Sequence, residues 1–282
     1  MNAILLISSA DQKGITAAVT NFVFEHKGNI LHADQHIDDQ ENIFFMRIEW
    51  SLEGFNLKRD QIATSFKSIA DKFSMDWQLS FTDEVDRMAV FVSKHVHCLY
   101  DLLYRYKDGQ LRCEIPLIIS NHAEAKPIAD HFGIRYEEFA IAPENKKEQE
   151  AKELALLKEE NINCLALARY HQIFSGDFVS NFPNRIINIH HSFLPAFVGQ
   201  DPYAQAYKYG VKIIGATSHY VIEELDAGPI IEQATTRVSH RDTLKDLKHH
   251  GEDLEKNVFA RAIRLHLERK ILTFNNKTVI FD

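Results

Sequence analysis

The chain contains 282 residues, of which 45% are hydrophobic and 26% are charged, and its formal net charge is −8. These values are typical of a globular protein with two domains or one large one, and the acidic balance disfavours nucleic acid as a partner, because phosphates attract basic surfaces. No apolar run approaches the roughly 20 residues of a membrane helix, and the apolar N-terminus lacks the basic region of a signal peptide, so we expect a cytoplasmic protein without a membrane partner.

The first part of the chain alternates short apolar strands with amphipathic helices. Strands are expected at Ala3–Ser8, Ile30–Ile37, Ile43–Trp50 and Trp77–Phe81. One helix is expected to begin at Ile15 and to end before Gly28, and a second at Leu57–Phe73. The resulting order, βαββαβ, predicts a ferredoxin-like domain.

A polar turn with a glycine follows the first strand, in the run Asp11-x-x-Gly14-Ile15-Thr16. This turn, together with the βαββαβ order, resembles the ACT domain over about 80 residues. The resemblance implies that a small amino acid binds as an effector near Asp11, Gly14 and Ile15. A glycine also permits a tight turn without any ligand, so a purely dimerising role stays open. Both interpretations favour a homo-oligomer.

The charged segment Thr82–Arg87 marks the domain boundary and divides the chain into residues 1–84 and 85–282. In the second domain, short apolar runs alternate with helical stretches, which predicts a doubly wound, mostly parallel sheet covered by helices. Its strands are expected at Met88–Ser93, Ile115–Ser120, Cys164–Ala168 and Arg185–Ile189. The other expected elements are helices near His95–Lys107, Ala123–Phe132, Asn145–Glu160 and Thr243–Leu267, and a terminal hairpin at Ile271–Phe274 and Thr278–Phe281.

The side chains that suggest chemistry follow the last of these strands. Asn188 and His190 are two residues apart, so on a strand they point to the same face, and the carboxyl end of such a strand is where ligands bind in open α/β sheets. An amide and an imidazole together can stabilise a carbonyl oxygen that becomes an anion. Asp226 lies in a loop that ends in Gly228-Pro229. Taken alone, such an aspartate more often caps backbone amides.

The pattern Asn188-x-His190-x-Ser192-x-x-Pro195, followed by His219 and Asp226, resembles the folate-dependent formyltransferase family from Met88 to the C-terminus. The resemblance implies a doubly wound sheet, catalytic roles for Asn188, His190 and Asp226, and a folate that is the substrate, with no separate cofactor. It also implies a folate pocket formed by Arg169, Tyr170, His171, Phe174, His219, Val221 and Leu225. At His171 and Phe174 the chain departs from the Arg-Tyr-Met-Gln-Ile-Leu run usual in the family, so we expect an altered pterin pocket.

Within that family, an ACT-like domain ahead of the catalytic domain resembles the members that hydrolyse 10-formyltetrahydrofolate to formate and tetrahydrofolate, which supplies formate for purine synthesis and balances folate pools. No glycine-rich phosphate loop follows the Met88–Ser93 strand, which favours water over a phosphorylated amine as acceptor. Asn188 and His190 are expected to stabilise the oxyanion. Asp226 is expected to act as general acid–base, with a pKa raised in the closed pocket. Formyl transfer to an amine and a non-catalytic amino-acid sensor remain the alternatives.

A hydrolytic metal site is a further interpretation of His190, His191, His219 and Asp226. Because neighbouring residues on a strand point to opposite faces, His190 and His191 are not expected to bind one ion. Three cysteines without CxxC spacing also give no sign of a structural zinc. We therefore expect no metal.

Overall fold

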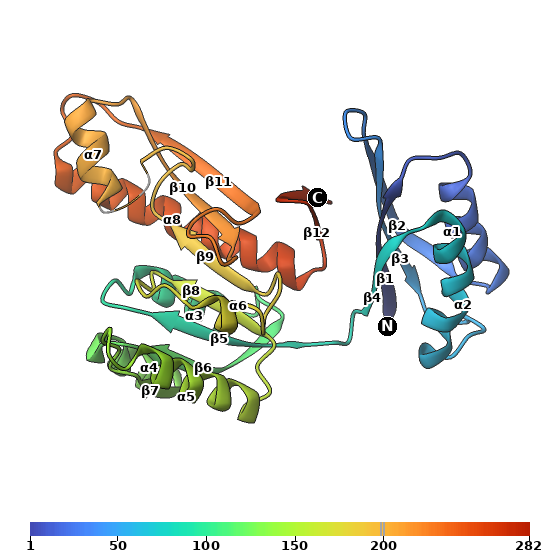
Figure 1. Cartoon of the computed structure of the whole chain (residues 1–282), viewed down its shortest axis with the longest axis horizontal. Coiled ribbons are helices and arrows are strands. Elements are labelled where there is room, and N and C mark those ends of the chain that lie inside the picture. The colour runs from blue at the N-terminus through green and yellow to red at the C-terminus, as the bar shows by residue number, and fades with distance from the viewer. Residues whose placement is uncertain (198, 200) are drawn as a thin grey trace. The chain divides into compact units, whose positions relative to one another are not determined.

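The computed structural model describes residues 1–197, 199 and 201–282 (Figure 1). Two compact units form within these residues. The first contains Met1–Val85, Arg269–Asn275 and Val279–Asp282, and the second contains Asp86–Glu268 and Asn276–Thr278. The C-terminal hairpin was expected in the catalytic domain, whereas most of its residues group with the first unit.

The first unit contains an antiparallel sheet with the strand order β2-β3-β1-β4. Its elements are β1 (Asn2–Ala10), α1 (Ile15–Glu25), β2 (Asn29–Asp38), β3 (Ile43–Ser51), α2 (Arg59–Phe73) and β4 (Asp76–Phe81). This arrangement confirms the predicted ferredoxin-like βαββαβ domain.

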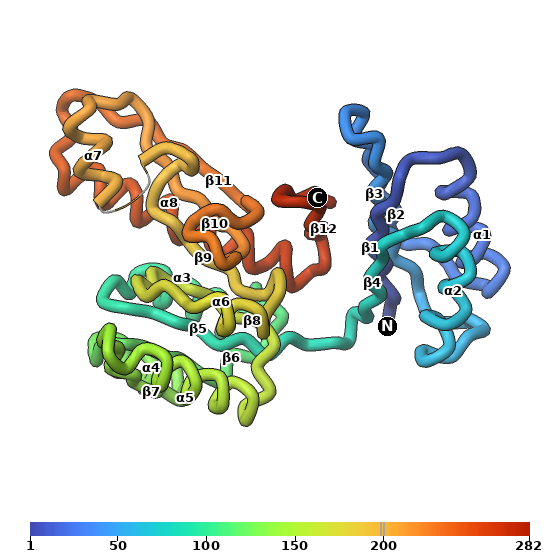
Figure 2. Tube along the Cα trace, viewed as in Figure 1, coloured from blue at the N-terminus to red at the C-terminus, as the bar shows by residue number. Residues whose placement is uncertain are grey.

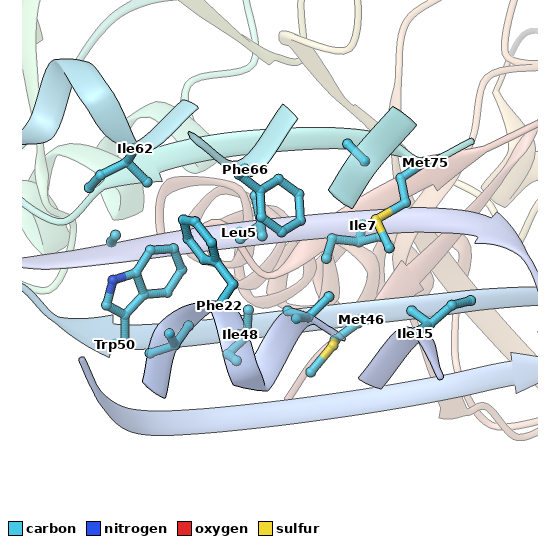
Figure 3. Close-up of a cluster of buried hydrophobic side chains, with 14 of the residues drawn as sticks. Leu5, Ile7, Ile15, Phe22, Met46, Ile48, Trp50, Ile62, Phe66 and Met75 are labelled. Atoms are coloured by element: carbon cyan, nitrogen blue, oxygen red, sulfur yellow. The ribbon is translucent and has the colours of Figure 1, made fainter. Parts of the chain in front are cut away.

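Both helices of the first unit bury their apolar sides against one face of its sheet, as Figure 3 shows. The rings of Phe22 from α1 and Phe66 from α2 meet edge to face, with centroids 5.4 Å apart. Trp50 of β3 is completely buried in the same cluster. Each such side chain contributes about 1.5–3 kcal/mol through removal of its apolar surface from water.

The opposite face of this sheet carries a smaller cluster, in which Leu6 and Phe45 pack with Leu272 and Phe281. The last two residues belong to the C-terminal segment, which forms the strands β12 (Ile271–Phe274) and β13 (Lys277–Ile280). The apolar residues of the terminal hairpin therefore have a packing partner within the first unit, which explains why they group with it.

The second unit is built on a sheet with the strand order β11-β10-β9-β8-β5-β6-β7. The strands from β9 to β7 are parallel, and β10 is antiparallel to both of its neighbours, which confirms the doubly wound, mostly parallel sheet. Its elements are β5 (Asp86–Val92), α3 (His97–Lys107), β6 (Cys113–Ser120), a 3-10 turn (Ala123–Ala125), α4 (Lys126–Phe132), β7 (Arg135–Glu138), α5 (Lys146–Glu159), β8 (Cys164–Ala168), α6 (Gly176–Val179), β9 (Ile186–His190), α7 (Pro202–Tyr209), β10 (Ile213–Tyr220), β11 (Ile230–Arg237) and α8 (Leu244–Leu267).

The order of these strands fixes where a ligand can bind. The chain passes from β5 to β6 and β7 on one side and then returns to β8 and β9 on the other side, as the trace in Figure 2 shows. The carboxyl ends of β5 and β8 therefore open a crevice at the point where the strand order reverses. Side chains of α5 and α6 join the core on one face of the sheet, and α3 packs against α8. No helix in the described part of the chain combines the length and the apolar character that crossing a membrane requires.

Candidate active site

Two strand ends and one loop form the site. Asn188 and His190 occupy the carboxyl end of β9, and the antiparallel pairing of β9 with β10 places His219 directly opposite Asn188. Asp226 lies in the loop between β10 and β11, with a left-handed backbone φ of 53° that aspartate tolerates better than most residues. The sheet thus brings the segment with Asn188 and His190 next to the segment with His219 and Asp226.

A glycine allows the Asp226 loop to fold closely onto β10. A Cβ atom at Gly228 would lie 1.8 Å from the carbonyl oxygen of Tyr220, so no other residue fits there without moving the loop. The backbone N–H of Tyr220 donates to the carbonyl of Pro229 over 2.9 Å, which closes the loop. The Asp-x-Gly-Pro pattern therefore has a structural reason, which is the approach of Asp226 to His219.

Each of the four residues has a polar atom close to a polar atom of another. Oδ1 of Asp226 is 3.3 Å from Nδ1 of His190 and 3.7 Å from Nε2 of His219. Nδ2 of Asn188 is 3.2 Å from Nε2 of His219. Nδ1 of His219 is 2.9 Å from the carbonyl oxygen of Tyr220, and because a carbonyl only accepts, this nitrogen carries a hydrogen. Nε2 of His190 is buried without a partner among the described residues.

The structure corrects one expectation about Asp226. Burial raises its pKa, as the sequence analysis anticipated, but the hydrogen bonds and charges of His190 and His219 outweigh burial and hold the pKa below its ordinary value. The prediction of a raised pKa is therefore wrong. The physical reason is that two imidazoles stabilise the carboxylate form. Asp226 is an ionised carboxylate in the free protein.

A cavity of about 580 Å³ opens beside these residues, a volume typical of sites for small organic ligands. All ten residues that the sequence analysis assigned to catalysis or folate binding line it: Asn188, His190, Asp226, Arg169, Tyr170, His171, Phe174, His219, Val221 and Leu225. Other lining residues had not been assigned to catalysis or folate binding, among them Leu167, Gln172, Ile173, Ile189, His191, Ile222, Glu223 and Glu224.

The residues of the Arg169–Phe174 stretch do not all have the same position in the cavity wall. Tyr170 and Phe174 are largely buried and pack with Phe91, so they support the wall from the core side. Ile173 is 53% exposed and Leu225 is 57% exposed, and these two apolar side chains stand at the rim. An exposed apolar rim suits the aromatic part of a bound ligand.

His191 also belongs to the cavity, although the sequence analysis placed it on the face opposite to His190. The strand β9 ends at His190, so the alternation of side chains does not extend to His191, and the two rings lie 5.2 Å apart. Burial and the nearby Arg169 lower the pKa of His191 to about 3 and that of His171 to about 4. Both side chains are therefore uncharged at neutral pH.

Within the described residues, one group of side chains is close enough to share a metal ion, and it does not include Asn188, His190 or Asp226. The ligand atoms of His97, Cys98 and Glu255 are all within 4.8 Å of one another. However, Glu255 already accepts hydrogen bonds from His97 Nε2 and from the Tyr203 hydroxyl, each over 2.7 Å. Burial also raises the pKa of the Cys98 thiol, so the thiolate that a metal would need is disfavoured.

The residues assigned to effector binding lie at the junction of β1 and α1. Gly14 precedes α1 with a φ of 98°, a conformation that favours glycine, and a Cβ atom there would meet nothing within 4 Å. Asp11 is half-buried, whereas the side chain of Ile15 is 1% exposed and packs in the core. The left-handed φ alone thus explains why a glycine occupies this position. The buried side chain of Ile15 is not accessible to a ligand.

Comparisons with known proteins agree with this architecture. The sequence profile of a family described as formyl transferase matches residues 86–263. The chain is 52% identical over 281 residues to the formyltetrahydrofolate deformylase of Synechocystis sp., with 100% of this chain and 99% of that protein covered.

Two solved structures differ in how much of this chain they cover. A formyltetrahydrofolate deformylase from Pseudomonas syringae pv. tomato has a TM-score of 0.97 and 42% identity, and covers 100% of this chain and 94% of its own. A glycinamide ribonucleotide transformylase 1 from Symbiobacterium toebii has a TM-score of 0.66 and 31% identity, and covers only 70% of this chain but 95% of its own. The chain therefore belongs to the formyl transferase family and, over its whole length, to the formyltetrahydrofolate deformylases within it.

Proposed function

We propose that this chain hydrolyses 10-formyltetrahydrofolate to formate and tetrahydrofolate, and that the folate is the substrate, with no separate cofactor. The observation that carries the proposal is the approach of His190 and His219 to the same oxygen of Asp226, at 3.3 and 3.7 Å, beside a cavity of about 580 Å³. The whole-length similarity to formyltetrahydrofolate deformylases supports the same activity.

In the proposed reaction, a water molecule attacks the formyl carbon and converts its carbonyl into a tetrahedral anion. The C–N bond then breaks, the nitrogen takes a proton, and the formyl group leaves as formate. Asn188 donates a hydrogen bond to the anion, and His190 donates from Nε2 when its ring carries both hydrogens, since Nδ1–H is directed to Asp226. Each well-placed donor is worth about 3–4 kcal/mol. Nδ2 of Asn188 has two hydrogens, so one can point to His219 and the other to the substrate.

Asp226 acts as the general base and then as the acid in this scheme. Its lowered pKa keeps it ionised in the free protein, so it can orient the attacking water and accept its proton. The proton passes to the departing nitrogen when the C–N bond breaks. His219 is a positioning residue, because its ring contacts both Asn188 and Asp226.

Water, rather than an amine, is the acceptor in this proposal. The loop that follows β5 has the sequence Ser93-Lys94-His95-Val96-His97, which contains no glycine that would let backbone amides approach a phosphate. The deformylase structure covers the complete chain, whereas the glycinamide ribonucleotide transformylase covers only 70% of it.

An assay of the purified protein with 10-formyltetrahydrofolate tests the proposal. We expect equal amounts of formate and tetrahydrofolate without any added acceptor. Consumption of the substrate only when glycinamide ribonucleotide or an amino sugar is present would identify a transferase instead.

The first unit is proposed to bind a small amino acid near Asp11 and Gly14 and to alter turnover, in a cytoplasmic homo-oligomer whose formate supports purine synthesis. The ACT resemblance supports this role. Calorimetry of the full chain with each amino acid, followed by the turnover assay, tests it. Absence of binding by every amino acid would leave the dimerising role.

A further inference from the structure

A second cavity, of about 390 Å³, adjoins the first one. Arg169, His171 and His191 line both cavities, so they form the boundary between them. Ionisable side chains provide most of the remaining wall: His95, His97, Asp201, Tyr203, Lys248, Glu252 and Glu255. Such a lining suits water and small ions, and it does not suit an apolar pterin ring.

Arg169 is a buried cation on this boundary with unused hydrogen-bonding capacity. Its side chain is 9% exposed, and its Nη1 atom reaches Oε1 of Glu255 only at 3.5 Å. Its Nε atom is buried without a hydrogen-bond partner among the described residues. A guanidinium has five N–H donors in a planar fork, an arrangement that matches the two oxygens of a carboxylate.

Uncharged histidines lie around Arg169. The ring of His171 is 5.9 Å from that of His95 and 6.3 Å from that of His191, measured between centroids. Burial and the charge of Arg169 lower the pKa of all three histidines. They can therefore donate hydrogen bonds near the guanidinium, and they add no positive charge that would retain an anion.

Two of the three carboxylates that line the second cavity have partners, and Glu252 adds a third negative charge. Glu255 accepts from His97 and from Tyr203, and Asp201 forms an ion pair with Lys248 at 3.1 Å. They leave most of the Arg169 fork unused, but their negative charge opposes tight binding of an anion. Weak binding is suitable for a product that must leave.

We propose that the second cavity binds formate at Arg169 and releases it while the folate still fills the first cavity. The inference rests on the proposed function, because formate is the small carboxylate which that reaction produces beside Arg169. The ligand class is a monocarboxylate small enough to fit beside the guanidinium in the second cavity. Formate has few atoms, so we expect binding no tighter than roughly millimolar.

A titration of the full-length protein with ¹³C-formate, followed by NMR line broadening, measures this binding without any folate. We expect Arg169→Gln to weaken formate binding by at least ~10-fold, and Arg169→Lys by at least ~5-fold, because lysine retains the charge but not the fork. Lys248→Gln is the matched control, since it removes a cation of the same cavity. Formate affinity of this variant should stay within ~2-fold of the wild type if the hydrogen bonds of the Arg169 guanidinium, and not the overall positive charge of the cavity, bind the anion.

A second measurement uses the wild-type protein and does not depend on the folding of a variant. The C–H proton of bound formate should give nuclear Overhauser effects to the ring protons of His171 and His191. Equal binding of inorganic phosphate with the same dependence on Arg169 would overturn the assignment to formate, as would unchanged binding in Arg169→Gln. The formate titration contains no folate, so its result does not depend on whether the protein hydrolyses 10-formyltetrahydrofolate. Failure of the formate site and failure of the proposed hydrolysis can therefore be distinguished.

Discussion

Nδ1 of His190 lies 3.3 Å from Oδ1 of Asp226, while Nε2 of the same ring is buried without a partner among the described residues. One nitrogen of the imidazole is thus held by the carboxylate, and the other is left for a ligand. A hydrogen bond at Nδ1 fixes the orientation of a histidine ring. The carboxylate therefore fixes the orientation of the ring before the substrate arrives, and Nε2 donates to a ligand when the ring carries both hydrogens.

Replacement of Asp226 by asparagine should reduce kcat by at least ~100-fold, because an amide cannot accept the proton of the attacking water. The side chain keeps its size, so binding of the folate should change little. Stopped-time assays of formate release, together with a folate-binding titration, measure the two effects. Asp177→Asn, an exposed change on α6 outside the cavity, is the control and should retain wild-type turnover. Full turnover by Asp226→Asn would exclude the general-base role.

Gly228→Ala should lower kcat by at least ~10-fold, since a Cβ atom 1.8 Å from the Tyr220 carbonyl forces the Asp226 loop away from β10. Gly133→Ala provides the comparison. Gly133 ends α4 with a φ of 69° and has open space around its Cβ position, so this variant should lose about 1 kcal/mol of stability but no activity. Equal kcat losses in the two variants would mean that stability, and not loop position, matters.

The exposed rim residues Ile173 and Leu225 should contribute to binding and not to chemistry. Ile173→Ser and Leu225→Ser are each expected to raise KM by roughly 10-fold with kcat unchanged, because burial of such a side chain is worth about 1.5–3 kcal/mol. Steady-state kinetics separate the two constants. A fall in kcat without a change in KM would contradict this assignment.

Glu153 of α5 should make stability depend on pH. It is completely buried, its Oε2 atom has no hydrogen-bond partner among the described residues, and burial raises its pKa from 4.5 to about 8. Because the folded pKa exceeds the unfolded one, the stabilising contribution is complete below about pH 4.5 and is lost as pH rises to about 8.

Glu153→Gln replaces this group with a neutral amide, so the variant should lack that loss of stability, which amounts to roughly 1.4 kcal/mol for each pH unit at most. Urea unfolding between pH 5 and pH 8 measures the slope. Glu159→Gln changes an exposed residue of the same helix and should keep the slope of the wild type. Parallel slopes for the wild type and Glu153→Gln would show that Glu153 is ionised in the folded protein.

Local sequence patterns predicted much of the fold and ten of the residues that line the cavity beside Asp226. Asn188 and His190 could be paired from strand alternation, and the long helix α8 from its apolar period. The four-residue strand β7 (Arg135–Glu138) was missed, because its sequence, Arg-Tyr-Glu-Glu, has no apolar run. The sequence also could not reveal the lowered pKa of Asp226, which depends on two histidines from different strands.

The second cavity could not be predicted from the sequence, because its residues come from distant elements. Glu255 of α8, His97 at the start of α3 and Arg169 after β8 meet only through the packing of distant elements. No spacing in the sequence connects them. Residue patterns thus predict the elements and the motif, and tertiary contacts determine the charges within the site.

The origin of the oxygen atoms in formate tests the central claim most directly. Turnover of 10-formyltetrahydrofolate in H₂¹⁸O, without any amine, should yield formate with one ¹⁸O atom and an equal amount of tetrahydrofolate, as mass spectrometry would detect. Failure to form formate, or formate without solvent oxygen, would contradict hydrolysis by water at Asn188, His190 and Asp226.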